Sequence, residues 1–126
     1  MPIGVDTGFF FALTEQHPLA VAVWKKEKII TSVIVLFELQ RKLHQGHFKH
    51  DISLINDIEM SVEIVDITPK IAKRGARISH GNNIPAMDAL ILASFLEVGC
   101  KEIYTRDDHL LQYQKRDIKI INLKNL

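Results

Sequence analysis

The feature that most constrains this chain is the regular alternation of short β-branched segments with helical segments. Five short segments have the composition of strands: 2–6, 29–32, 62–67, 102–105 and 118–123. Helix-like periodicity and end signals mark the segments between them: 8–15, 18–28, 33–46, 50–60, 68–81 and 84–99. This alternation favours an α/β fold with a parallel sheet covered by helices on both faces. In such a sheet the ligand crevice lies beyond the carboxyl ends of the strands.

The composition is that of an ordinary globular protein. With 126 residues, 47% of them hydrophobic and 25% charged, we expect a single domain over residues 1–126. The net charge of +1 gives no overall basic field, although it allows a local basic face. The single cysteine, Cys100, excludes an intramolecular disulfide and favours a cytoplasmic location. We expect no signal peptide, because the first residues lack a basic segment followed by a long enough apolar stretch. We expect no membrane span, because no apolar run approaches roughly 18 residues.

Acidic residues interrupt four segments that otherwise read as core. Asp6 ends the first predicted strand, Glu38 lies within VIVLFELQ, and Asp88 lies within PAMDALILAS. Asp107 and Asp108 follow directly after the strand EIYT. Aspartate and glutamate are rarely buried unless they are paired or bind a metal ion, so this pattern calls for an explanation.

Each acid also has an ordinary structural interpretation. Asp6 and one of the two acids after the fourth strand could cap helices. Glu38 could pair with Lys42 one helical turn later. Asp88 could lie in the first turn of its helix, where the macrodipole favours an acid. That helix is apolar nearly all round, however, and the sequence offers Asp88 no counter-charge one turn away.

Considered together, the acids predict a shared metal site. Several carboxylates in one pocket repel one another unless a divalent cation is present. Oxygen ligands of this kind suit Mg²⁺ or Mn²⁺ better than zinc. Such an ion activates water and stabilises charge on a phosphoryl oxygen, so the sequence indicates phosphodiester hydrolysis.

Four stretches carry a family resemblance: IGVDTGFFFAL, ITSVIVLFEL, IPAMDALILASFLEVGC and EIYTRDDHLLQ. In this order and at this spacing they resemble PIN-domain ribonucleases, most closely the VapC-type toxins of toxin–antitoxin modules. The resemblance implies a three-layer α/β/α sandwich around a short, mostly parallel sheet. It also implies Mg²⁺- or Mn²⁺-dependent endonucleolytic cleavage of RNA. The implied partners are a cognate antitoxin and a second copy of the chain in a homodimer.

The resemblance assigns roles to individual residues. The four acids of the family match Asp6, Glu38, Asp88 and Asp107. The family's supporting hydroxyl positions match Thr7 and Thr105. By this match the three aspartates hold one cation, directly or through water. Glu38 orients or deprotonates the attacking water, or helps with a second ion. The two threonines fix the carboxylate rotamers.

The sequence departs from the family pattern at two places. Gly8 follows Asp-Thr, where many members have Ser or Asn. His109 and Leu110 occupy the last two places of the family's T-x-D-x-D-F pattern. Asp108 is an additional acid, so either it or Asp107 could face the metal, and the register favours Asp107.

The sequence also offers a candidate substrate-binding residue, and it leaves alternative functions open. Arg106, between a strand end and the acids, is the candidate for binding an RNA phosphate. The main alternative is a catalytically silent PIN-like module that binds RNA or acts as a scaffold. A receiver-type phosphoacceptor domain is a third possibility, but it requires adjacent acids after the first strand, and VDTG supplies only one. The resemblance favours the toxin of a type II toxin–antitoxin pair, and a stand-alone processing nuclease stays open as an alternative.

Overall fold

Five short parallel strands form one sheet. The computed structural model describes residues 2–113 and 115–124. Its strands are β1 (Ile3–Val5), β2 (Ile29–Ser32), β3 (Glu63–Val65), β4 (Glu102–Thr105) and β5 (Lys119–Asn122). They lie in the order β3-β2-β1-β4-β5, and every neighbouring pair is parallel. The strand order reverses beside β1, and in parallel α/β sheets such a reversal marks the ligand crevice.

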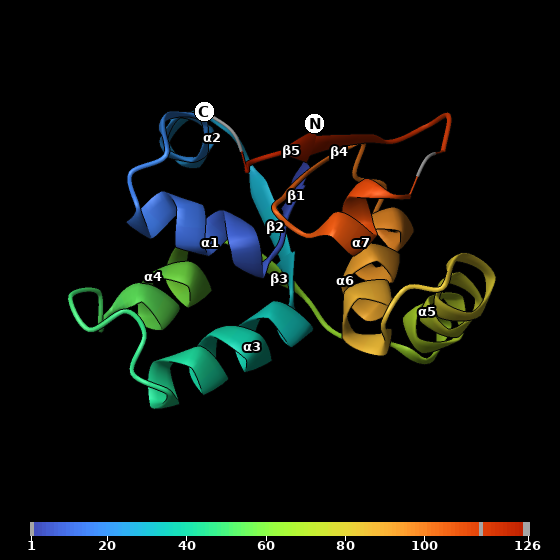
Figure 1. Ribbon diagram of the computed structural model, residues 1–126, viewed down its shortest axis with the longest axis horizontal. Coiled ribbons are helices and arrows are strands. Elements are labelled where there is room, and N and C mark those ends of the chain that lie inside the picture. The colour runs from blue at the N-terminus through green and yellow to red at the C-terminus, as the bar shows by residue number, and fades with distance from the viewer. Residues whose placement is uncertain (1, 114, 125–126) are drawn as a thin grey trace.

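Helices cover both faces of the sheet, which confirms the predicted three-layer fold. They are α1 (Thr7–Thr14), α2 (Pro18–Lys26), α3 (Val33–His44), α4 (Leu54–Ser61), α5 (Pro69–Asn82), α6 (Ala86–Glu97) and α7 (Asp108–Leu111). Figure 1 shows α1 and α4 on one side of the sheet and α5 and α6 on the other. Within residues 2–113 and 115–124, no helix has the length and apolar character needed to cross a membrane.

Local sequence signals set several of the helix starts. The Ser32 hydroxyl accepts a hydrogen bond from the Ile34 N–H at 3.1 Å and caps α3. The Thr68 hydroxyl accepts one from the Ile71 N–H at 3.1 Å and caps α5. Each bond satisfies one of the backbone donors that the first turn of a helix leaves free.

The predicted strand 2–6 is too long at its carboxyl end. β1 ends at Val5, and Asp6 is the N-cap of α1 rather than the last strand residue. Its side chain accepts a hydrogen bond from the Phe9 N–H at 3.1 Å, which commits the chain to a helix immediately after the strand. The other predicted elements are present and differ from the observed ones only at their ends.

The helix α6 is locked against the sheet by a close approach to β1. Phe95 has no exposed surface, and its ring lies directly over Gly4. A Cβ atom at position 4 would lie 2.7 Å from the Phe95 Cγ. The Ser94 hydroxyl also donates to the Ser32 hydroxyl at 3.2 Å. These contacts fix the position and rotation of α6 relative to β1 and β2.

We expect Gly4→Ala to destabilise the protein by about 1–3 kcal/mol, because the added methyl group overpacks the core against a fully buried ring. The midpoint of urea denaturation measures this effect. Gly81→Ala in α5 is the matched control, since a Cβ there meets no atom within 4 Å. It should be neutral or stabilise by up to about 1 kcal/mol, because alanine favours the helix. Equal midpoints for Gly4→Ala and the wild type would contradict the close packing.

Candidate active site

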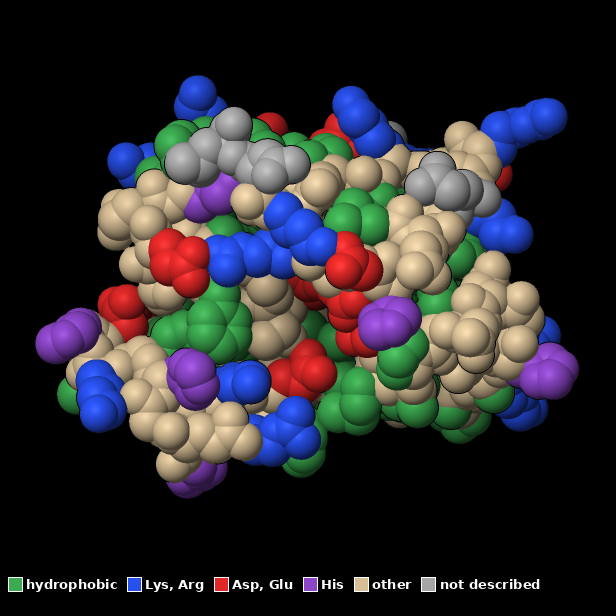
Figure 2. Space-filling model, in the orientation of Figure 1, with side chains coloured by type: hydrophobic (Ala, Val, Ile, Leu, Met, Phe, Trp, Pro, Cys, Tyr) green, Lys and Arg blue, Asp and Glu red, His purple; other side chains and the backbone are tan. Residues whose placement is uncertain are grey.

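A cavity of about 270 Å³ lies at the carboxyl ends of β1 and β4. Its walls come from four separate segments: Asp6, Thr7, Gly8, Glu38, Arg41, Lys42, Asp88, Ile91, Arg106 and Asp107. Figure 2 shows acidic side chains gathered in a hollow on this face of the molecule. The fold therefore brings the acids that stand out in the sequence into one cavity, although they come from distant parts of the chain.

Asp6 is the most deeply buried of these acids, with 4% of its surface exposed. One carboxylate oxygen accepts the Phe9 N–H, and the other accepts the Thr105 hydroxyl. Burial raises the pKa of Asp6 to about 7, although both hydrogen bonds favour the charged form. The nearby charges of Asp107 and Glu38 raise it further.

Two threonine hydroxyls hold the acidic side chains in place. Thr105 is fully buried at the end of β4, donates to Asp6, and accepts a hydrogen bond from the Asp107 N–H at 2.9 Å. Thr7 donates to a carboxylate oxygen of Glu38. The structure thus places both predicted supporting hydroxyls in contact with predicted acids, and each fixes the orientation of one carboxylate.

Asp88, Asp107 and His109 form a tighter group within the site. The His109 Nδ1 lies 3.2 Å from an oxygen of Asp107 and 3.6 Å from an oxygen of Asp88. Partial burial raises the pKa of Asp88 to about 7, and the neighbouring Asp107, Glu38 and Asp6 add to this shift. A carboxyl group that is surrounded by other carboxylates resists losing its proton.

This group has the donor set of a divalent metal site. One ligand atom from each of Asp88, Asp107 and His109 lies within 4.8 Å of the others. Carboxylate oxygens bind Mg²⁺ and Mn²⁺, and an imidazole nitrogen adds a ligand type that suits the transition metals. A cation here would also offset the like-charge repulsion that raises the pKa of Asp88. The residues present therefore fit a divalent ion.

The two adjacent acids after β4 have different surroundings. Asp107 lines the cavity and caps α7, where it accepts the His109 N–H at 2.7 Å. Asp108 does not line this cavity and forms an ion pair with Lys124. That hydrogen-bonded pair holds the pKa of Asp108 below its ordinary value. Of the two acids, Asp107 is therefore the one placed to contact a bound ion.

Arg106 lies in the cavity wall, but its guanidinium group is already engaged. It forms an ion pair with Glu15, the residue that follows α1. The sequence places Arg106 near the acids but gives no sign of this partner, because the two residues are 91 positions apart.

Three further residues contribute to the site beyond those assigned from the sequence. Arg41 and Lys42 lie in the cavity wall, one turn after Glu38 on α3. The helical spacing of three and four residues from Glu38 is the signal that could have identified them. Lys42 forms no ion pair with Glu38, whose carboxylate is bound to Thr7 instead. His109 takes part in the acidic cluster at a position where the family pattern places an acid.

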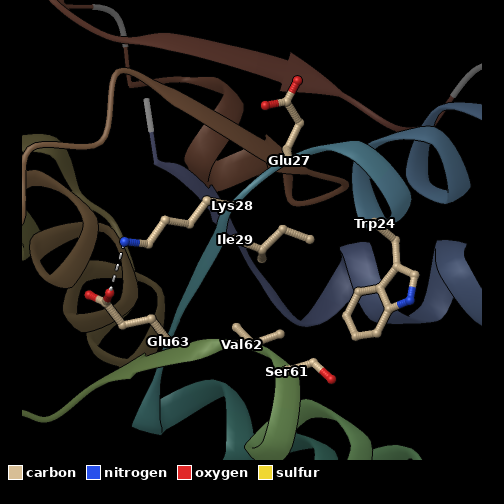
Figure 3. A pocket seen from close by; sticks show the side chains of 7 residues that line it. All are labelled: Trp24, Glu27, Lys28, Ile29, Ser61, Val62 and Glu63. Atoms are coloured by element: carbon tan, nitrogen blue, oxygen red, sulfur yellow. Dashed lines mark ion pairs between the residues drawn. The ribbon is translucent and has the colours of Figure 1, made fainter.

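A second cavity, of about 320 Å³, lies at the opposite end of the sheet. Figure 3 shows its lining, which includes the first residues of β2 and β3, Ile29 and Glu63. Lys28 pairs with Glu63 across it at 3.8 Å. Because its acids and lysine are exposed and come from the amino ends of the strands, it lacks the crowded carboxylates of the first cavity.

Comparison with known proteins identifies the family. The PIN-domain family model matches residues 3–116. The fold is similar to VapBC-1 from nontypeable Haemophilus influenzae, with a TM-score of 0.76, 14% identity, and coverage of 99% of this chain and 100% of that chain. It is also similar to VapBC2 from Rickettsia felis bound to a promoter DNA fragment, with a TM-score of 0.73, 20% identity, and coverage of 97% and 98%.

A third similar structure is Mycobacterium tuberculosis VapC20, described as a sarcin–ricin loop cleaving toxin. Its TM-score is 0.70 at 21% identity, with coverage of 86% of this chain and 93% of that chain. Comparison with curated protein sequences finds no match. The family match covers most of the chain, and the structural neighbours share its fold at low identity. The chain therefore belongs to the PIN-domain family, and its structural neighbours are VapC toxins of VapBC toxin–antitoxin complexes.

Proposed function

We propose that this protein is a divalent-metal-dependent endoribonuclease and the toxin of a type II toxin–antitoxin pair. The observation that carries the proposal is the convergence of Asp6, Glu38, Asp88 and Asp107 on one cavity at the carboxyl ends of the strands. So many carboxylates in one site are unfavourable without a cation, and a cation among carboxylates is suited to phosphoryl chemistry.

In this proposal the acidic residues divide into two roles. Asp88 and Asp107 would hold a divalent ion, Mg²⁺ or Mn²⁺, with Asp6 as a third carboxylate and His109 as a neighbouring nitrogen ligand. Such an ion would supply stabilisation of the negative charge that develops on the phosphate and would make water easier to deprotonate. Glu38, held by the Thr7 hydroxyl, orients the attacking water and accepts its proton.

Basic residues around the cavity bind the substrate in the same proposal. Arg41 and Lys42 from α3 and Arg106 after β4 surround the acids. Their charges neutralise the phosphates on either side of the scissile bond, which otherwise are repelled by the carboxylates. Thr105 holds Asp6 and the backbone of Asp107 at a fixed separation, so the ligand geometry is set before substrate arrives.

The proposed partners follow from the structural neighbours. Several of these were crystallised as toxin–antitoxin complexes, including one from Klebsiella pneumoniae and a DNA-bound VapBC from Salmonella typhimurium. We propose a cognate antitoxin and a second copy of this chain as partners, with residues 1–126 acting as a single nuclease domain.

Asp88→Asn should reduce cleavage of single-stranded RNA at least about 100-fold, since even the loss of an outer-shell partner typically costs about 10–100-fold in metal sites. Activity is measured with Mn²⁺, with Mg²⁺ and with EDTA, and we expect none with EDTA. Asp107→Asn should lose far more activity than Asp108→Asn, because only Asp107 lines the cavity.

Asp66→Asn is the matched control for these variants. Asp66 also follows directly after a strand, β3, but it is exposed and does not line the cavity. This variant should keep wild-type activity. Metal-independent cleavage, or equal activity of the wild type and Asp88→Asn, would contradict the proposed nuclease and favour the silent RNA-binding module.

The free energy of unfolding of the metal-free protein should depend on pH through Asp6 and Asp88. Both have pKa values raised from 3.8 to about 7 by burial, so the folded state binds protons more tightly than the unfolded state. Their contribution to stability is therefore present at low pH and is lost as the pH rises from about 4 to about 7. Urea denaturation in EDTA at pH 5 and pH 8, compared between wild type and Asp88→Asn, isolates the Asp88 contribution.

Divalent metal should remove much of this loss at pH 8. Metal at 100 times its Kd stabilises the folded protein by about 2.7 kcal/mol if it does not bind the unfolded chain. Asp88→Asn should be more stable than wild type without metal and gain little from Mn²⁺. Wild type that shows no stabilisation by either ion at pH 8 would rule out the proposed site.

A further inference from the structure

A third cavity adjoins the acidic one and shares a wall with it. It has a volume of about 430 Å³ and is lined by Glu15, Gln16, His17, Pro18, Arg106, Leu123 and Lys124. Arg106 lines both cavities, so the two are neighbours across one side chain. The volume lies within the range of about 300–1,000 Å³ typical of small-ligand sites. It is therefore large enough for part of an extended substrate that continues beyond the acids.

Two cations line this cavity, and each is paired with a carboxylate from elsewhere in the chain. Arg106 pairs with Glu15, and Lys124 pairs with Asp108. Figure 2 shows Lys and Arg side chains between Asp and Glu side chains on this face, beside the acidic hollow. The two basic groups therefore lie in a row next to the proposed metal site.

The exposures of these four side chains show which partner can leave. The cations are 29% and 40% exposed, whereas Glu15 is 58% and Asp108 is 72% exposed. Exposed ion pairs of this kind contribute only about 0–1 kcal/mol, so another anion can displace the carboxylates at little cost. A phosphodiester can take their place, because its two free oxygens match the two-pronged guanidinium of arginine as a carboxylate does.

The backbone fixes both cations relative to the acidic site. Arg106 lies between Thr105, which binds Asp6, and Asp107. The Leu123 N–H donates to the Thr105 carbonyl at 2.8 Å, and Leu123 is 1% exposed. The Lys124 N–H donates to the Asn122 side chain at 2.8 Å. The base of the Lys124 side chain is thus anchored to the same strand end that positions the acids.

We propose that Arg106 and Lys124 form a second phosphate subsite, which holds the RNA strand one or more nucleotides away from the scissile bond. This inference rests on the proposed ribonuclease function. Glu15 and Asp108 occupy the subsite in the free protein and compete with the substrate for the two cations. The competition weakens binding of any polyanion that does not also engage the metal site.

Binding of a fluorescently labelled single-stranded RNA of about 20 nucleotides tests the subsite. Fluorescence anisotropy is measured with Ca²⁺ in place of Mg²⁺ and at several salt concentrations. Lys124→Gln should weaken binding about 3- to 10-fold and reduce the slope of log K against log salt by about 1, the effect of losing one phosphate contact. Glu15→Gln should tighten binding about 3-fold, because it frees Arg106.

Lys28→Gln and Glu63→Gln are the matched controls. They remove the same charges from an exposed ion pair at the opposite end of the sheet (Figure 3), and they should leave RNA affinity within about 2-fold of wild type. If Lys124→Gln and Glu15→Gln behave like these controls while the wild type binds and cleaves RNA, the subsite is wrong and the nuclease proposal stands. If the wild type binds no RNA, both proposals fail.

Discussion

The crowding of carboxylates at the carboxyl end of the sheet is the constraint on which the rest of the site depends. Burial raises the pKa of Asp6 and of Asp88 to about 7, and neighbouring acids add to both shifts. A fold gains nothing in stability from such a cluster, since each buried charge without a partner is unfavourable. The structure offsets the cost only in part, through the Thr105 hydroxyl and the Phe9 N–H on Asp6 and the Thr7 hydroxyl on Glu38. The repulsion and desolvation that these hydrogen bonds leave uncompensated are the physical reason for proposing a cation in this cavity.

The contact between β1 and α6 holds two of the acids at a fixed separation. Gly4 allows the ring of Phe95 to lie against β1, and the same helix carries Asp88 two turns earlier. Asp6 follows β1 directly, so the packing of one glycine against one ring fixes the separation of two acids. Thr105 adds β4 to this arrangement through its bond to Asp6. Core packing and site geometry are therefore set by the same few contacts.

The sequence was sufficient to predict the parallel α/β fold and the acids that converge, because both depend on short-range patterns. Strand and helix periods are visible within each segment, and the carboxyl ends of parallel strands must share one edge of the sheet. An acid within an apolar segment such as PAMDALILAS is equally visible. The assignment of these acids to a PIN-like site rests on the resemblance, which depends on four motifs in the family's order.

What the sequence could not supply were the pairings between distant side chains. The Glu15–Arg106 and Asp108–Lys124 ion pairs depend on how loops meet after folding. The family register favours Asp107 over Asp108 for the cavity, and Asp107 does line it. The sequence gives no sign, however, that Asp108 pairs with Lys124. The predicted strand 2–6 extends one residue beyond β1 at its carboxyl end for a related reason. Asp6 is compatible with a strand by its neighbours, and only its bond to the Phe9 N–H makes it a helix cap.

The distribution of charge around the cavity is compatible with the polyanionic substrate that we propose, even though the net charge of the chain is only +1. Arg41, Lys42 and Arg106 surround the acids, so a phosphate that approaches the cavity meets positive charge at the rim and negative charge at the centre. In the function that we propose, the acids at the centre repel a phosphate unless a metal ion offsets their charge. Substrate binding would then depend on the ion. The ion pair between Glu15 and Arg106 has a similar effect at the rim of the cavity. In the subsite that we propose, a polyanion must displace the Glu15 carboxylate before it can pair with Arg106.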